Sequence, residues 1–433
     1  MLRRHLLLTI HVIILLTLIA LPTHAQDTDT ENDGCIAATG DPIRLGMIFP
    51  ESSFFSVRTG QHAQGAEAML AAINACGGVD GRPVDVIYLP AADRAEAEAT
   101  ALQLIEDDGV PLIIGSGVPA VHDALVDVVN EAEVVLWEVT QPITARPDAW
   151  AFSPRATTNQ LGAFTVNFVQ DEVIPLLDGD PLRAALIYEN GNRGRGIAAG
   201  VLDALPTPPI IAIDYADSLR NTFTIADQLR DQSINTVILA TFDDDADRLW
   251  YAAREADANV TAWINIGSEG FQRDLCQRIG NNEHILSVTP GGPVSDAYLQ
   301  ATDGAIYATY RRTHLAQFNE ASSQRADLAA SGVYLLLRYV LPQVDGPYTA
   351  ETIRAAIIEA EVATGAGFLG EGLAMLETGD NTNAAAVVQQ RQNGAFCSVW
   401  PEAIATCLNP TEPMPTWRDR AIMAETMTCN AGI

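Results

Sequence analysis

The sequence predicts an α/β fold of two doubly wound parallel-sheet lobes joined by crossover hinge segments. Strand-like runs alternate with helical runs over most of the 433 residues. The runs 111–114, 134–137 and 236–239 are apolar without alternation, which is typical of strands buried on both faces of a parallel sheet. The pattern starts again near residue 153. Because alternating strands and helices with right-handed crossovers build open doubly wound sheets, the restart indicates a second lobe.

The first unit, residues 43–89, predicts a strand, a helix and a second strand. Apolar residues recur at i, i+4 and i+7 from Ala66, as they do on one face of a helix. Gly77 and Gly78 then supply the left-handed cap that ends such a helix. The loop 50–58 has no phosphate-binding glycines, so we expect it to form one wall of a cleft rather than a nucleotide site.

The other elements are predicted in the same way, helices from the helical spacing of apolar residues and strands from short apolar runs. Strands are predicted at 43–49, 84–89, 111–115, 134–139, 183–189, 209–214, 235–241, 261–266 and 285–289. Helices are predicted at 60–75, 93–107, 119–131, 159–173, 193–204, 221–230, 244–256, 298–315, 329–340 and 349–360.

The N-terminus has the pattern of an export signal. Two arginines, an apolar run over 6–21 and a small-x-small site ending at Ala25 predict a cleaved signal peptide over residues 1–25. The alternative is an uncleaved membrane anchor, for which the run is short. Residues 26–41 are expected to form a disordered acidic lead.

The restart of the pattern divides the rest of the chain. We expect lobe 1 to contain residues 42–153 and 285–368, and lobe 2 to contain 154–284 and 369–405. The C-terminal tail, 406–433, has no functional assignment from its sequence. Small ligands bind at domain interfaces and at the carboxyl ends of parallel strands, so we expect a ligand site in a cleft between the lobes.

The charge excludes several functions. The formal net charge is −30, and all 25 basic residues are arginine. Such a surface repels nucleic acid and anionic lipid, and its simplest interpretation is solubility or adaptation to salt. Without lysine, no Schiff-base or phosphate-loop lysine exists. The sequence also lacks the G-x-S-x-G elbow and the dinucleotide G-x-G-x-x-G after its first strand, so no enzyme activity or cofactor is expected.

Six cysteines in a chain with an export signal favour disulfides. Cys397–Cys407 is the most local candidate pair. The remaining four cysteines, Cys35, Cys76, Cys276 and Cys429, can pair in three ways. No C-x-x-C occurs and the histidines do not cluster, so no metal site is expected. The run 243–245 of three aspartates is interpreted as a solvated helix N-terminus rather than a calcium loop.

The order of several motifs resembles the type I periplasmic binding proteins. The matching segments follow one another with that family's spacing over roughly residues 42–405, and they are 43–89, 112–115, 183–200, 237–253 and Trp263–Gly270. The branch that is most similar is the leucine/isoleucine/valine-binding, amino-acid-type receptor of ABC transporters. The resemblance implies two hinged lobes that close on a small ligand.

The resemblance also implies ligand-binding residues. Glu269 in Gly-Ser-Glu-Gly matches the family carboxylate that binds a ligand ammonium, and Phe242 stands where the family usually has tyrosine. In lobe 1, Ser116 and Thr140 are the hydroxyls expected to hold a ligand carboxylate. Trp137 is the aromatic candidate at a strand end.

Two positions qualify these assignments. Pro119 aligns with the family's serine, so Ser116 or backbone N–H groups at the start of the following helix would have to replace it. Glu138, beside Trp137, is interpreted as an exposed strand-end charge, with a second acid at the cleft as the alternative.

The function implied by the resemblance is extracytoplasmic solute binding. A monomeric, exported protein, periplasmic or extracellular, would capture an amino acid or related amide and deliver it to an ABC transporter permease. The alternatives are an amino-acid or amide sensor with the same fold and a secreted enzyme.

Overall fold

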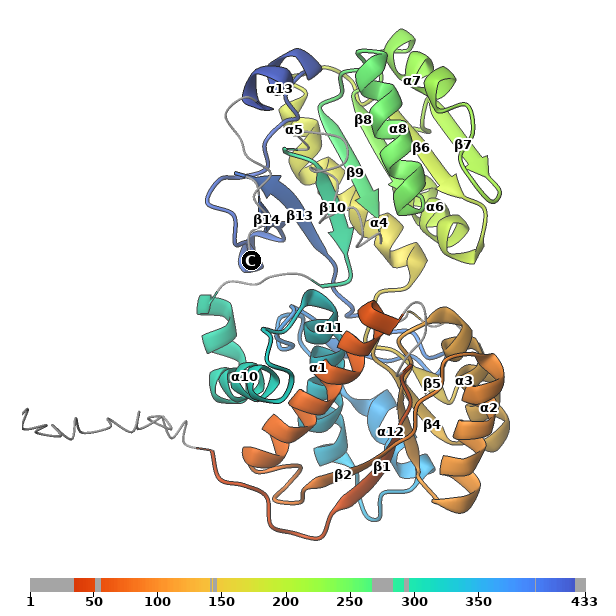
Figure 1. The fold of residues 1–433 in the computed structure, drawn as a ribbon, viewed down its shortest axis with the longest axis vertical. Coiled ribbons are helices and arrows are strands. Elements are labelled where there is room, and N and C mark those ends of the chain that lie inside the picture. The colour runs from red at the N-terminus through yellow and green to blue at the C-terminus, as the bar shows by residue number, and fades with distance from the viewer. Residues whose placement is uncertain are drawn as a thin grey trace, which may run out of the picture. The chain divides into compact units, whose positions relative to one another are not determined.

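The computed structural model describes residues 35–50, 56–140, 142, 146–266, 283–291, 296–393 and 395–424. Within these ranges two sheets are each flanked by helices (Figure 1), which confirms the predicted fold class. None of the helices in this part of the chain is both long and apolar enough to cross a bilayer. The predicted signal peptide, 1–25, lies outside the described residues.

The sheet of lobe 1 is parallel throughout. Its strand order is β2-β1-β3-β4-β5, so the order reverses between β1 and β3, at the position where open α/β sheets bind ligands. The strands are β1 (Ile43–Met47), β2 (Val84–Tyr88), β3 (Leu112–Gly115), β4 (Val135–Glu138) and β5 (Ala151–Phe152). All but the two-residue β5 were predicted.

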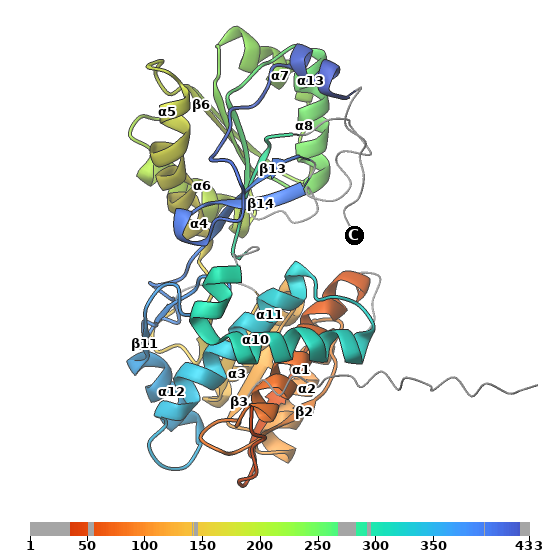
Figure 2. The ribbon, with the colours of Figure 1, turned by 90° about the vertical axis from the view of Figure 1, so that its left-hand side faces the viewer.

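Helices cover both faces of this sheet. Ile114 and Trp137 share one apolar core with α1 (Ser56–Ala75), α11 (Gln324–Leu335) and α12 (Ala350–Glu359). Alternate residues of the same strands point to the opposite core, which contains α2 (Arg94–Leu102) and α3 (Pro119–Ala132). Figure 2 shows α10 (Asp296–Phe318) beside α11 and α1.

Glycine allows α1 and α11 to pack closely. A Cβ atom on Gly65 would lie 2.0 Å from the backbone oxygen of Ala326, so no other residue fits there without movement of the backbone. The helix α11 begins five residues before its predicted start, because Ser323 caps it by accepting the backbone N–H of Ala326. It then continues as π-helical and 3₁₀ turns over Leu336–Val340 and Leu341–Gln343.

The sheet of lobe 2 has the order β14-β13-β10-β9-β8-β6-β7. The first five strands along the chain are parallel, β13 pairs antiparallel with β10, and β14 pairs antiparallel with β13. They are β6 (Ala184–Glu189), β7 (Ile211–Tyr215), β8 (Thr236–Ala240), β9 (Ala262–Ile266), β10 (Leu286–Thr289), β13 (Val387–Gln392) and β14 (Ala395–Trp400). Because β10 pairs with β9, it belongs to lobe 2, whereas the expected boundary at residue 285 assigned it to lobe 1. Leu373 and Met375 lie in the core of lobe 1, whereas the expected boundary at residue 369 assigned them to lobe 2.

The helices of lobe 2 also form two layers. One face of the sheet is covered by α4 (Thr158–Phe168) and α6 (Asn192–Ala204), and the other by α7 (Thr222–Asp231) and α8 (Asp243–Glu255). The predicted helices 93–107 and 159–173 end in π-helical turns at Gln103–Asp107 and Val169–Val173, the second followed by α5 (Ile174–Leu176).

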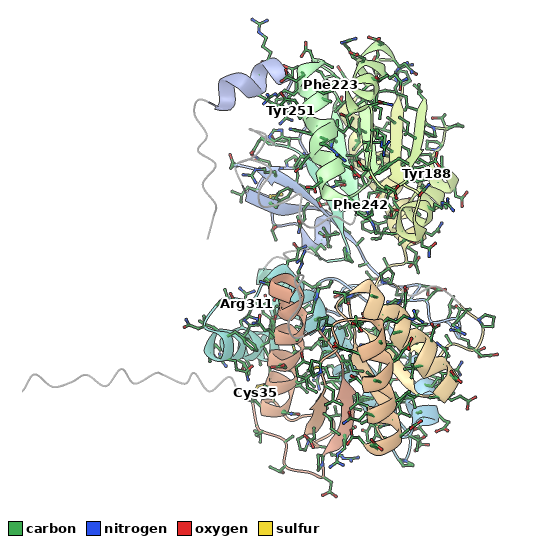
Figure 3. All side chains as sticks on the ribbon, turned by 45° about the vertical axis from the view of Figure 1, so that its right-hand side comes forward. Cys35, Tyr188, Phe223, Phe242, Tyr251 and Arg311 are labelled. Carbon is green, nitrogen blue, oxygen red and sulfur yellow. A yellow bond between two sulfur atoms is a disulfide. The ribbon has the colours of Figure 1, made fainter. Side chains whose placement is uncertain are left out.

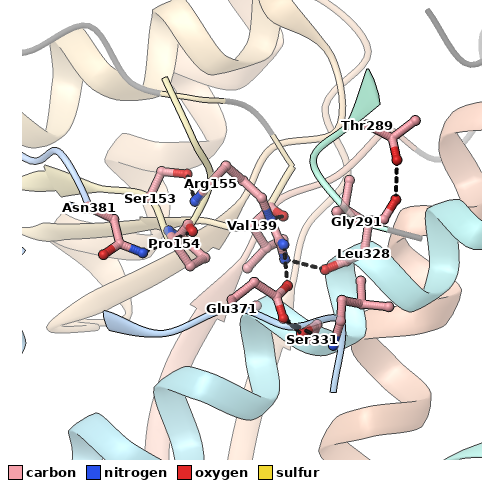
Figure 4. A network of polar contacts seen from close by, with 12 residues as sticks. Val139, Ser153, Pro154, Arg155, Thr289, Gly291, Leu328, Ser331, Glu371 and Asn381 are labelled. Carbon is pink, nitrogen blue, oxygen red and sulfur yellow. Dashed lines mark hydrogen bonds and ion pairs between the residues drawn. The ribbon is translucent and has the colours of Figure 1, made fainter. Parts of the chain in front are cut away.

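A buried ion pair holds the segments that cross between the two sheets (Figure 4). The guanidinium of Arg155 donates to the Glu371 carboxylate at 2.5 Å and to the carbonyls of Val139 and Leu328 at 2.9 and 2.5 Å. The hydroxyl of Ser331 donates to the other Glu371 oxygen at 2.8 Å. Both charged side chains are 1 % exposed, so each charge depends on these partners for its stabilisation.

Two disulfides lie within the described residues. Cys397–Cys407 confirms the local pair, and Cys35–Cys76 selects one of the open pairings. Cys276 and Cys429 lie outside the described residues. The Cys35 bond and a hydrogen bond from Ala38 N to Asn74 O at 2.9 Å hold residues 35–41 against α1, so the prediction of disorder for 26–41 is wrong from Cys35 onward.

The C-terminal tail packs on lobe 2 as far as it is described. Met414 N donates to Thr261 O at 2.9 Å, and the indole N–H of Trp417 donates to Ala258 O at 2.8 Å. The ring of Trp417, at the start of α13 (Trp417–Ala424), lies 4.9 Å from that of the buried Trp250. The tail therefore completes a core rather than extending away from it.

Removing one partner of the buried ion pair should lower the free energy of unfolding more than replacing both partners. Arg155→Ala leaves the Glu371 carboxylate buried without its partner, and we expect it to lower the free energy of unfolding by about 3–5 kcal/mol. The paired change Arg155→Met with Glu371→Leu should recover most of that loss, since neither charge remains. Urea unfolding measures both. The control is Arg94→Ala, which removes two exposed ion pairs; an equal effect of the control would contradict the assignment.

The two disulfides should stabilise the fold unequally. They close loops with sequence separations of 41 and 10 residues, and loop-closure entropy assigns them about 4 and about 3 kcal/mol, respectively. We expect Cys35→Ser with Cys76→Ser to lower the melting temperature more than Cys397→Ser with Cys407→Ser. Thermal unfolding of the two double variants tests this order. A larger loss of melting temperature without Cys397–Cys407 would contradict the prediction from loop length.

Candidate ligand-binding site

The strands β3 and β4 of lobe 1 end side by side. Gly115 and Glu138 are register partners, so the segment that begins at Ser116 and the one that reaches Thr140 leave the same edge of the sheet. The helix α3 begins just after the first segment, at Pro119. Polar groups at the carboxyl ends of adjacent parallel strands can reach a single small group, and here they do.

The group that they reach is the carboxylate of Glu138. One carboxylate oxygen accepts the backbone N–H groups of Ser116 and Thr140 at 3.0 and 2.8 Å, and the Thr140 hydroxyl at 2.8 Å. The other accepts the Ser116 hydroxyl at 2.6 Å and faces Nδ1 of His122 at 3.0 Å. The Thr140 oxygen in turn accepts the backbone N–H of Gly117 at 3.0 Å.

This carboxylate is ionised although it is buried. Burial by itself favours the neutral acid, but the hydrogen bond and the charge of His122, with the donors of Ser116 and Thr140, outweigh it and lower the pKa of Glu138 to about 2. Burial likewise opposes the charge on His122, but its bond to Glu138 outweighs burial and raises the pKa of His122.

The interpretation of Glu138 as an exposed strand-end charge is therefore wrong. Its side chain is 0 % exposed. The sequence reasoning also missed His122, one turn into α3. One sequence signal could have predicted the burial of Glu138 and the need for partners such as His122. It is a single acid at the end of an apolar strand, next to a strand that is followed by a serine. Such a carboxylate needs hydrogen-bond donors.

Trp137 lies on the other side of the same strand. It is fully buried in the core shared with α1 and α11, and its indole N–H donates to the backbone oxygen of Gly332 at 2.8 Å. The structure thus brings Ser116 and Thr140 together on one carboxylate, and places Trp137 in the core beside them.

In lobe 2, Arg193 joins the ends of three parallel strands. It follows β6 and donates to the backbone oxygens of Thr241 at 2.8 Å, after β8, and of Ile266 at 3.2 Å, the last residue of β9. Its guanidinium lies 5.7 Å from the centroid of the Phe242 ring. Figure 3 shows Phe242 near the start of α8, and its side chain is 51 % exposed.

Glu269 lies outside the described residues, which stop at Ile266 and resume at residue 283. The structure therefore places Phe242 and the end of β9 at one edge of the lobe 2 sheet, and Glu269 remains a sequence-based prediction. No group of three or more potential metal ligands occurs in the described ranges. The aspartate run begins α8, which confirms the predicted helix N-terminus, but the expectation that the run is solvated is wrong for Asp245, which is buried and accepts the backbone N–H of Leu219 at 3.1 Å.

The Glu138 cluster should stabilise the fold in a limited pH window. The pKa of Glu138 falls from its ordinary 4.5 to about 2 on folding. Its contribution to the free energy of unfolding is therefore complete above pH 4.5 and is lost as the pH falls towards 2. The pKa of His122 rises from 6.5, so its contribution is complete below pH 6.5 and is lost as the pH rises through the raised value.

We therefore expect the stability difference between the wild type and Glu138→Gln to be largest between pH 4.5 and pH 6.5 and to shrink on both sides. Urea unfolding as a function of pH measures it. The exposed acid Glu98, changed to Gln, controls for the loss of one charge. A difference that does not vary with pH would contradict the coupling of these two groups.

Comparison with known proteins agrees with this architecture. A family model described as periplasmic binding protein matches residues 42–395. A Leu/Ile/Val-binding protein homolog 7 of Brucella abortus is 22 % identical over 389 residues, which cover 86 % of this chain and 94 % of that protein.

Solved structures share the fold. An ABC transporter substrate-binding protein of Desulfitobacterium hafniense in complex with Leu aligns with a TM-score of 0.61 and 17 % identity, over 83 % of this chain and 100 % of that one. The branched-chain amino acid transporter substrate-binding protein LivJ of Streptococcus pneumoniae in complex with isoleucine aligns with a TM-score of 0.60 and 17 % identity, over 82 % and 98 %. Because the family model spans most of the sequence, the chain belongs to the periplasmic binding protein family.

Proposed function

We propose that this protein captures a small amphipathic ligand, an amino acid or a related amide, between its two lobes. The observation that carries the proposal is the buried polar cluster of Ser116, Glu138 and Thr140 at the carboxyl ends of β3 and β4, beside the position where the sheet order reverses. Family membership supports solute binding, and the names of the relatives support an amino acid as the ligand class.

The proposal assigns a role to each candidate residue. Glu269 faces a ligand ammonium, and Phe242 covers an apolar part of the ligand from lobe 2. Ser116 and Thr140 shape the lobe 1 side of the site, and Trp137 supports them from the core. A carboxylate and an ammonium form a charge-assisted hydrogen bond of about 1.5–3 kcal/mol.

Ligand capture in this proposal is a population shift between open and closed lobes. A ligand favours the closed form only through contacts that the open form does not make. The closed form then docks on an ABC transporter permease, and no bond in the ligand is broken. The N-terminal export pattern supports a periplasmic or extracellular location, and the protein would act as a monomer.

A thermal-shift screen of amino acids, their amides and urea tests this function. We expect at least one amine-bearing compound to raise the melting temperature, and isothermal titration to show that Glu269→Gln weakens its binding about 10–100-fold, as loss of one charge-assisted hydrogen bond implies.

Glu255→Gln is the matched control, because it removes an exposed acid from α8 of the same lobe and should leave the affinity unchanged. If no compound in the screen raised the melting temperature, the proposed function would be wrong. If Glu269→Gln bound the compound as the wild type does, the role of Glu269 alone would be wrong.

A further inference from the structure

The donors at the ends of β3 and β4 form a complete carboxylate-binding site. Two backbone N–H groups, from Ser116 and Thr140, and the hydroxyls of both residues converge on two oxygens at 2.6–3.0 Å. These distances are those of charge-assisted hydrogen bonds to an ionised acceptor.

The anion in this site comes from the chain itself. Glu138 fills the site with its own carboxylate and holds His122 as a counter-charge at 3.0 Å. The Thr140 hydroxyl, which donates to Glu138, also accepts the N–H of Gly117. The donors that could hold a ligand carboxylate are therefore already engaged by an internal one.

A second carboxylate has no favourable position beside this one. It would compete for N–H and hydroxyl groups already bound to Glu138, and it would bring a like charge next to an ionised group that is fully buried. Like charges interact strongly where water is excluded. A neutral or cationic group brings no like charge next to Glu138.

We propose that Glu138 substitutes for the carboxylate of the ligand, so that this protein selects a ligand without a free carboxylate: an amide or amine rather than an amino acid. The inference rests on the proposed function, because it names the class of ligand for the same site. It makes the internal carboxylate a specificity-determining group that need not touch the ligand.

Matched ligands test this selectivity in the wild-type protein. L-leucine, L-leucinamide and isoamylamine share a side chain and an amine and differ at the carboxyl group. Isothermal titration of the full mature chain should show at least a tenfold preference for leucinamide or isoamylamine over leucine. If leucine bound as tightly as leucinamide or more tightly, the inference would be overturned.

Glu138→Ala tests the substitution directly. The variant vacates the site but keeps the backbone donors of Ser116 and Thr140, so a free carboxylate can enter. We expect L-leucine to raise the melting temperature of Glu138→Ala and not that of the wild type. Sodium acetate should do the same relative to sodium chloride of equal ionic strength. A variant as insensitive to leucine and acetate as the wild type would refute the internal substitution.

Asp327→Ala is the control for destabilisation in the leucine experiment, because it removes a largely buried carboxylate of α11 in lobe 1 that accepts the Tyr310 hydroxyl at 2.8 Å and should gain no response to leucine. If Glu138→Ala does not fold, the wild-type comparison of the three ligands still decides the inference. Two negative results would have different meanings. If no compound in the thermal-shift screen raised the melting temperature, the proposed solute binding would be wrong. If the wild type preferred ligands with a free carboxylate, only the role of Glu138 would be wrong.

Discussion

The architecture depends on one buried ion pair, between Arg155 and Glu371. The chain crosses between the sheets near both residues, and the guanidinium also reaches the loop after β4 through Val139 and the helix α11 through Leu328. Removing two charges from water is unfavourable unless good geometry and further hydrogen bonds offset it. The pair therefore tolerates few arrangements of these segments.

The Glu138 cluster applies the same physics at the edge of a sheet. In each case a carboxylate is buried with a cationic partner, at least one hydroxyl and at least one backbone N–H group, and the cationic partner comes from another segment of the chain. The difference lies in position. Glu371 joins crossing segments, whereas Glu138 lies where ligands approach open α/β sheets, and so its charge bears on selectivity as well as on stability.

The sequence predicts much of the fold because hydrophobic periodicity reports local burial. Thus β2 begins at the predicted residue, and α3 differs by one residue at its end. Pairing is not local, so periodicity could not place β10 in lobe 2. The surroundings of Glu138 depend on Ser116, 22 residues away, which explains why its burial was missed. The resemblance predicted Ser116 and Thr140 as ligand-binding hydroxyls, but it did not predict that both would bind Glu138.

The order in which the chain builds its two sheets constrains its folding. The core of lobe 1 needs Ile353 and Met375, and the lobe 2 core needs Met414, with Trp417 packed against it, although lobe 2 starts its sheet at β6. Neither lobe is a continuous stretch of sequence. Native contacts thus span long separations, which slows folding, and almost the whole chain must be synthesised before either core can close. A chain that is built in this way stays unfolded until nearly all of it has been synthesised.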